Sequence, residues 1–134
     1  MQLNQVKALV TGGVSGLGLG VARHIIANGG KAVLLDINDE AGAAAEEELD
    51  TRYIRTDVTS EEGVIASVDA AVEANGGLNV AMNCAGIIGA GRELGREAPM
   101  PLSCFQTTVI VNLVGRFNVA MAAASVWERN VPGN

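Results

Sequence analysis

A glycine-rich segment near the N-terminus has the composition and spacing of a phosphate-binding turn. Residues 11–18 read TGGVSGLG, and they lie between an apolar run and a segment with helical periodicity. Gly12 would permit a tight turn, Gly16 would let the backbone approach a pyrophosphate, and Gly18 would let the helix pack on the strand. The first N–H groups of the helix and its dipole would then face the phosphates. The segment predicts a dinucleotide site, and a plain glycine turn is the alternative.

An acidic residue follows at the end of the next apolar run. Asp36 closes the run 31–36, and an acid about 20 residues beyond such a glycine turn accepts hydrogen bonds from the adenosine ribose hydroxyls. Its carboxylate would repel a 2′-phosphate, and the next residues, Ile37 and Asn38, carry no positive charge to neutralise one. The pattern favours NAD over NADP. Capping of a helix or turn is the alternative role for Asp36.

The elements that must position these residues alternate along the chain. Asp39 is the expected N-cap of the second helix, and Thr59 or Ser60, with Glu62 in a capping box, that of the third. Alternation of strands and helices predicts an α/β fold with a doubly wound parallel sheet, right-handed crossovers and three layers, in one domain spanning 1–134. The periodicities predict strands at 6–10, 31–36, 53–55 and 78–83, and helices at 16–27, 39–49 and from the cap at 59 or 60 to about 75.

Composition and charge exclude several classes of protein. The net charge is −6 and the arginines are scattered singly, so we expect no nucleic-acid partner. Cys84 and Cys104 have no metal-site spacing, which predicts no metal and a reducing, cytoplasmic compartment. No stretch reaches about 18 apolar residues and no signal peptide precedes the first strand, so we expect a soluble protein without a membrane partner.

The C-terminal third contains one long loop and one long helix. Residues 87–101 are rich in glycine, proline and charge, and a loop of this length is usually functional or mobile. The helix expected at 103–127 is apolar nearly all round, so the sheet alone cannot cover it, and we expect a homo-oligomer, a tetramer or a dimer, through this helix. Asn112 is the polar side chain within its run VIVNLV. It should have a specific role, although a core Asn bonded to backbone is the alternative.

Taken together, these motifs resemble the short-chain dehydrogenase/reductase family over essentially the whole chain. The resemblance rests on the glycine segment, Asp36, the pair 57–58, the run 83–86 and Asn112. It implies a Rossmann-type fold and NAD-dependent oxidation of a secondary alcohol, with Asp57 and Val58 beside adenine and Asn112 in the proton relay as a catalytic residue. It also implies that the cofactor site is made of Gly12, Ser15, Gly16, Leu17, Gly18, Asp36, Ile37, Asp57, Val58, Asn83, Cys84, Ala85 and Gly86.

Two features refine this resemblance. The family usually has Asn where this chain has Cys84, which leaves mostly backbone contacts there; a reactive thiol is the alternative. The segments 91–99 and 111–119 look most similar to the type 2 3-hydroxyacyl-CoA dehydrogenases. That similarity implies a small-molecule alcohol or ketone as substrate, either an acyl-CoA or a steroid-like compound.

The catalytic residues of the family are not matched in this sequence. The family uses a Ser and a Tyr followed by Lys four residues later, whereas Tyr53 is followed at that spacing by Asp57. We therefore expect this chain to be inactive alone and to bind NAD weakly or not at all, with Val80 and Met82 on a bare sheet edge. The rest of the enzyme is expected in a longer protein, or a partner stabilises a natural half-domain. A non-catalytic NAD-binding or interaction module is the main alternative, and a flavodoxin-like domain a weaker one.

Overall fold

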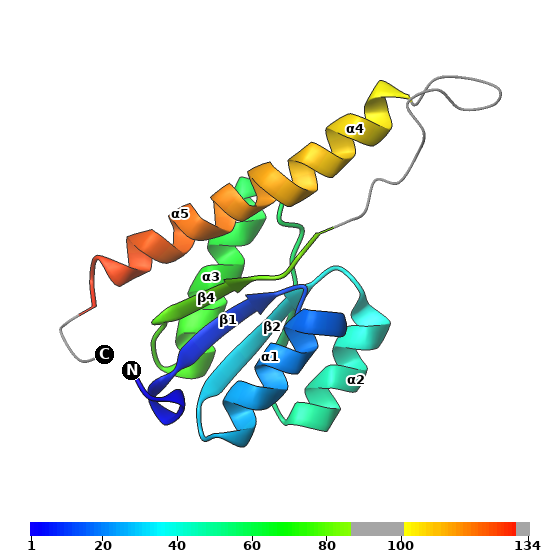
Figure 1. The fold of residues 1–134 in the computed structure, drawn as a ribbon. Coiled ribbons are helices and arrows are strands. Elements are labelled where there is room, and N and C mark those ends of the chain that lie inside the picture. Colours follow the sequence, from blue (N-terminus) through cyan, green and yellow to red (C-terminus); the bar gives the residue numbers. More distant parts are fainter. Residues whose placement is uncertain (87–100, 131–134) are drawn as a thin grey trace.

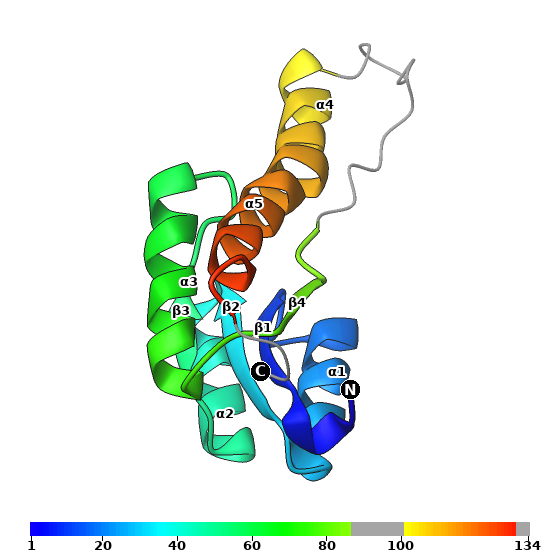
Figure 2. The ribbon, with the colours of Figure 1, turned by 90° about the vertical axis from the view of Figure 1, so that its left-hand side faces the viewer.

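The described chain forms a parallel sheet between helices (Figure 1). The computed structural model describes residues 1–86 and 101–130. Its strands lie in the order β3-β2-β1-β4 and all pair in parallel. Figure 2 shows the sheet between α3 on one side and α1 on the other. The strands are β1 (Lys7–Thr11), β2 (Lys31–Asp36), β3 (Tyr53–Arg55) and β4 (Val80–Asn83); the helices are η1 (Leu3–Gln5), α1 (Gly16–Ala27), α2 (Asp39–Leu49), α3 (Glu61–Asn75), α4 (Leu102–Val109), η2 (Ile110–Val114) and α5 (Gly115–Trp127).

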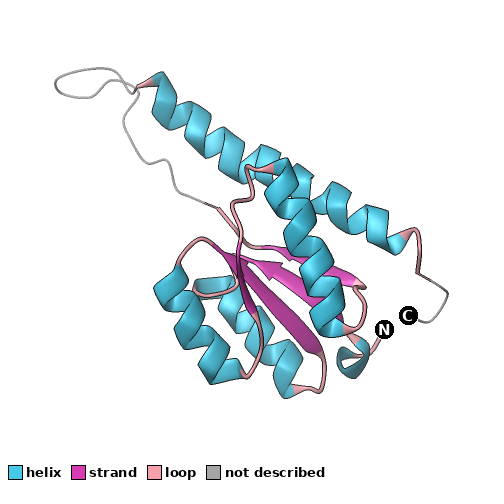
Figure 3. Ribbon diagram, turned by 180° about the vertical axis from the view of Figure 1, so that it is seen from behind, coloured by secondary structure: helices cyan, strands magenta, loops and turns pink. Residues whose placement is uncertain are grey.

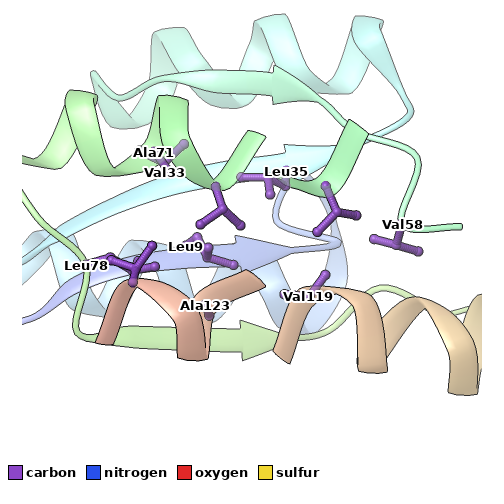
Figure 4. Packing of buried hydrophobic residues seen from close by; sticks show 11 residues of the cluster. Leu9, Val33, Leu35, Val58, Ala71, Leu78, Val119 and Ala123 are labelled. Atoms are coloured by element: carbon purple, nitrogen blue, oxygen red, sulfur yellow. The ribbon is translucent and has the colours of Figure 1, made fainter. Parts of the chain in front are cut away.

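The central strands are apolar because both of their faces are buried. In β1, Leu9 points to the layer of α3 and α5, while Ala8 and Val10 point to the layer of α1 and α2. In β2, Val33 and Leu34 divide between the two layers in the same way. Figure 4 shows the first of these clusters, in which side chains from the sheet meet α3 and α5. The predicted doubly wound α/β fold in three layers is confirmed.

One predicted helix cap is wrong by one position, and another is confirmed without its predicted capping box. Asn38, not Asp39, is the N-cap of α2, and its side chain accepts a hydrogen bond from the Ala41 N–H at 3.0 Å. Asn and Asp cap equally well, so sequence could not choose between neighbours. Ser60 is the N-cap of α3, which puts Gly63 rather than Glu62 at the third helical position. Glycine has no side chain to reach back, so the expected capping box does not form.

The edge of the sheet opposite the carboxyl ends of the strands is joined by asparagine side chains. The Lys7 N–H donates to Asn79 Oδ1 at 2.7 Å, and Asn79 Nδ2 donates to the Gln5 carbonyl at 2.8 Å. Buried Asn75 donates to the Ala8 carbonyl at 2.8 Å. Asn75 and Asn79 both precede β4, which starts at Val80 rather than at the predicted residue 78.

The predicted long helix is present, with an irregular turn at its middle. α4, η2 and α5 follow one another without a break (Figure 3). Of these, η2 is a π-helical turn. One face, including Gly115, Val119 and Ala123, is buried on the sheet layer, whereas Phe105 and Phe117 are each 61% exposed. Within residues 1–86 and 101–130, the rest of the structure therefore covers one side of the helix and leaves the other exposed. The predicted loop 87–101 lies outside the described residues except for Pro101.

The same helix is the one membrane-span candidate among the described residues. From Leu102 to Trp127 it is long and apolar enough, on average, to cross a membrane. This segment is not an uninterrupted apolar stretch of about 18 residues, because Asn112 and Arg116 lie within it. A core helix passes the same test, and the Val119 face of this one packs into the sheet.

Candidate nucleotide-binding site

A cavity of about 690 Å³ lies where the carboxyl ends of the strands meet. This is the edge at which open α/β sheets bind ligands. Twelve of the thirteen predicted cofactor residues line it; Asn83 does not, because it ends β4 in register with Thr11. The lining consists of Gly12, Ser15, Gly16, Leu17, Gly18, Leu35, Asp36, Ile37, Thr56, Asp57, Val58, Cys84, Ala85, Gly86 and Val111.

The glycine turn has the geometry of a backbone cradle. Gly12 and Gly16 have φ of +63° and +53°, which favour glycine. A Cβ on Gly12 would lie 2.7 Å from the Cys84 carbonyl oxygen, and one on Gly18 would overlap the carbonyl of Gly12. A Cβ on Gly16, in contrast, would meet no atom within 4 Å. The turn is closed on the protein side and open on the cavity side.

The N-terminus of α1 faces this open side. Ser15 occupies the N-cap position, and its side chain makes no capping hydrogen bond. The first N–H groups of the twelve-residue helix are therefore not bonded by that side chain, and the helix dipole adds partial positive charge there. Together with the open backbone at Gly16, this arrangement suits a pyrophosphate.

Thr11 joins the glycine turn to the end of β4, a role that the sequence analysis missed. Its buried Oγ1 accepts hydrogen bonds from the N–H groups of Cys84 and Ala85, each at 3.1 Å. The Cys84 N–H also reaches the Thr11 carbonyl at 3.2 Å. A threonine at the end of an otherwise apolar buried strand was the available signal, because a buried hydroxyl needs a partner.

Asp36 lies at the cavity wall with one carboxylate oxygen engaged by its own loop. Oδ1 accepts from the Ile37 N–H at 2.7 Å and the Asn38 N–H at 3.4 Å. These bonds orient the carboxylate at the tip of β2. Among the lining residues in the described part of the chain are the acids Asp36 and Asp57 and no Lys or Arg.

The Asp57 segment forms another part of the wall. Asp57 Oδ1 accepts from the Thr59 hydroxyl at 2.7 Å and from the Thr59 N–H at 2.9 Å, and these bonds lower the pKa of the carboxyl group. The Val58 carbonyl accepts from Asn118 Nδ2 at 3.0 Å. A Cβ on Gly115 would lie 2.6 Å from the Val58 side chain, so α5 can approach this segment only because residue 115 is glycine.

Asn112 lies in the π-helical turn η2, beside the end of the β4 segment. A Cβ on Gly86 would lie 3.1 Å from Asn112 Oδ1, so the amide is next to the run 84–86. Asn112 is half-buried. The irregular turn places Asn112 beside this run, while its catalytic role stays a prediction.

Tyr53 is not suited to accept a proton from a substrate. Its hydroxyl lies on β3, 2.8 Å from Asp39 Oδ1 and 3.0 Å from the Asp36 carbonyl oxygen. Burial, and next the bond to Asp39, raise the pKa of Tyr53 to about 12. A general base near neutral pH needs a lowered pKa instead.

Comparison with known proteins identifies the family of this fold. The family model described as short chain dehydrogenase matches residues 6–134. The chain belongs to the short-chain dehydrogenase family. A short-chain dehydrogenase from Mycobacterium ulcerans has a similar solved structure, with a TM-score of 0.78 and 31% identity over 89% of this chain and 45% of the other. The expected family and its Rossmann-type fold are confirmed, and such folds generally bind NAD(P).

Several dehydrogenases are similar to this chain in sequence. The chain is 40% identical over 129 residues to "3-hydroxyacyl-CoA dehydrogenase type-2" of Bos taurus, covering 93% of this chain and 49% of the relative. It is 42% identical over 112 residues to "3-alpha-(or 20-beta)-hydroxysteroid dehydrogenase" of Mycobacterium bovis, covering 82% and 42%. This short-chain dehydrogenase sequence therefore spans about half the length of these relatives.

Proposed function

We propose that this chain is the NAD-binding part of an oxidoreductase that oxidises a secondary alcohol such as a 3-hydroxyacyl-CoA. The observation that carries the proposal is Asp36 at the wall of the cavity, where the lining residues that the structure describes include no Lys or Arg. A carboxylate there can accept hydrogen bonds from the ribose hydroxyls and repels a 2′-phosphate. The substrate class rests on the relatives named 3-hydroxyacyl-CoA dehydrogenase type-2.

The residues fit a dinucleotide along the length of the cavity. The backbone of Gly16 and the first turn of α1 would hold the pyrophosphate, Asp36 with Ile37 the adenosine ribose, and Asp57 with Val58 the adenine. When bound, NAD supplies a nicotinamide ring that accepts a hydride from the alcohol carbon.

The proton of the alcohol hydroxyl must be taken by a base. No residue of this sequence matches the Tyr-x-x-x-Lys pattern that supplies that base in the family. Asn112, beside Gly86, would position a water in a proton relay rather than take the proton itself. We therefore propose that the chain alone has no turnover. In a complete enzyme, Asn112→Leu should lower kcat with NAD affinity nearly unchanged, whereas an equal loss of both would assign Asn112 a structural role.

The test of the cofactor assignment is a binding comparison on the 134-residue chain. NMR titration of backbone amides detects weak binding, so NAD and NADP can each be added to the chain and to Asp36→Ala. We expect Asp36→Ala to weaken NAD binding by about tenfold or more, because charge-assisted hydrogen bonds are lost. The ratio of NAD affinity to NADP affinity should therefore fall in this variant. Asp69→Ala removes the same charge from the exposed surface of α3 and serves as the control. Equal results for the two variants would refute the ribose assignment.

The exposed face of the long helix supports a second part of the proposal, a homo-oligomer formed through residues 103–127. Phe117 and Met121 are 61% and 50% exposed and border a groove of about 430 Å³ between α3 and α5. Exposed apolar patches of this kind are typical of protein interfaces. Light scattering should give a dimer or tetramer of the complete enzyme, and a monomer after Phe117→Glu. The same mass for both proteins would refute an interface through this helix.

We also propose a cytoplasmic location.

An interaction module without catalysis is the second candidate function, and the same exposed helix face favours it. The two candidates differ in the residues that the gene should encode downstream of this segment. A Ser followed by Tyr-x-x-x-Lys in the same reading frame would support the dehydrogenase, and its absence the interaction module.

A further inference from the structure

A pair of opposite charges lies just outside the cavity wall, at the adenosine end. Arg55 ends β3 and pairs in register with Asp36, so the two side chains leave the sheet on the same face. Arg55 Nη1 donates to the Ile37 carbonyl at 2.9 Å and to Asp39 Oδ2 at 2.9 Å. The Arg55–Asp39 pair thus links β3 to the residues that directly follow Asp36.

Tyr53 fixes the acidic member of this pair. Its hydroxyl lies 2.8 Å from Asp39 Oδ1, so both carboxylate oxygens of Asp39 are engaged, one by Tyr53 and one by Arg55. The ring itself packs against Gly42, where any Cβ would lie 2.5 Å from a ring carbon. The position of Asp39 is therefore set by a packed aromatic side chain as well as by the ion pair.

The charge of Arg55 lies near the cavity although the residue does not line it. Arg55 directly precedes Thr56 and Asp57, which do line the cavity, and its positive charge contributes to the lowered pKa of Asp57. Its Nη1 hydrogen bonds are made to Ile37 and Asp39. The side chain is 65% exposed, so no packing prevents it from turning once its partners are removed.

We infer that Asp39 is a specificity residue for the dinucleotide, because its carboxylate engages the Arg55 guanidinium, which lies beside Ile37 and could otherwise bind a 2′-phosphate. This inference rests on the proposed function. Asp36 disfavours the 2′-phosphate by repulsion, and Asp39 does so by withholding the nearby guanidinium that could bind it. Arginine binds phosphate through charge-assisted, bidentate hydrogen bonds, so its release would favour the phosphorylated ligand.

The experiment compares two ligands that differ only by the 2′-phosphate, adenosine 5′-phosphate and adenosine 2′,5′-bisphosphate. Each is titrated into the 134-residue chain and its variants, and binding is measured from backbone amide shifts in NMR spectra. Asp39→Ala should raise the affinity for the bisphosphate relative to the monophosphate by about 3- to 10-fold. Glu40→Ala removes the same charge from the neighbouring exposed position and should change the ratio by less than about 2-fold. The double variant Asp39→Ala, Arg55→Gln should have the same ratio of bisphosphate to monophosphate affinity as the Glu40→Ala control.

Each result bears on the inference in a defined way. Equal ratios for Asp39→Ala and Glu40→Ala would overturn it, as would a shift that persists without Arg55. If the parent chain binds the monophosphate at the Gly16 and Asp36 amides but the ratio does not move, only this inference fails. If the parent chain binds neither ligand at those amides, the proposed function fails and the inference with it.

Discussion

Replacing Gly18 with alanine tests whether the first helix packs directly on the glycine turn. The new methyl would lie 2.8 Å from the carbonyl carbon of Gly12 and closer still to its oxygen, well inside the roughly 3.5 Å at which carbon atoms touch. Backbone atoms cannot swing aside as a side chain can, so the overpacking cost should be near about 3 kcal/mol. Alanine returns about 1 kcal/mol through its better helix propensity. We expect a net loss of about 2 kcal/mol in the free energy of unfolding.

Gly20→Ala is the matched control on the same helix. A Cβ on Gly20 would meet no atom within 4 Å and the position is exposed, so alanine there should stabilise by about 1 kcal/mol. Urea unfolding followed by circular dichroism at 222 nm measures both variants against the parent chain. The two should differ by about 3 kcal/mol with opposite signs. If Gly18→Ala were as stable as Gly20→Ala, the close approach of α1 to the turn would be wrong.

Three further predictions concern single groups. Tyr53 is the one tyrosine of the chain, so its absorbance at 295 nm should titrate near pH 12, and Asp39→Ala should lower that midpoint. Because this pKa is raised in the folded state, its stabilisation is present below pH 10 and is lost as the pH rises from 10 to about 12; a midpoint near 10 in folded protein would contradict this. Ser60→Ala should cost about 1 kcal/mol in urea unfolding, and an unchanged midpoint would argue against the cap. Thr59→Val should raise the pKa of Asp57 in carbon NMR titrations. The stabilisation from that lowered pKa is present at neutral pH and is lost as the pH falls through it, so the stability difference between the variant and the parent should disappear in acid, and a constant difference would refute the cause.

Much of the fold could be predicted from the sequence because its signals are local. The apolar run that ends at Asp36 predicts β2, and the glycine at position 76 predicts the C-terminal end of α3. The glycine turn was recognisable because three glycines occur at positions where backbone must approach backbone or ligand. The grouping of the predicted cofactor residues around one cavity follows from parallel pairing, which brings the carboxyl ends of all four strands to one edge.

Other features depend on contacts between distant residues and could not be predicted. The pattern of apolar residues from 103 to 127 predicts a helix but does not distinguish the π-helical turn at Ile110–Val114 from regular α-helix. Tyr53 and Arg55 looked like ordinary strand residues; their bonds to Asp39 exist only because β3 pairs beside β2. Similarly, the choice between Asn38 and Asp39 as helix cap depends on how the loop leaves β2.

The central place of β1 in the sheet also sets the order in which the chain can fold during synthesis. β1 pairs with β2 on one side and with β4 on the other, and the bond between Lys7 and Asn79 joins residues 72 positions apart. A ribosome adds about 5 to 20 residues each second, so β1 waits roughly 4 to 14 s for its second neighbour. During that interval β1, α1 and β2 can already associate, because their contacts are local. The side of Leu9 that α3 and α5 cover in the folded chain stays exposed until those helices are made, and apolar surface exposed in this way is prone to aggregation.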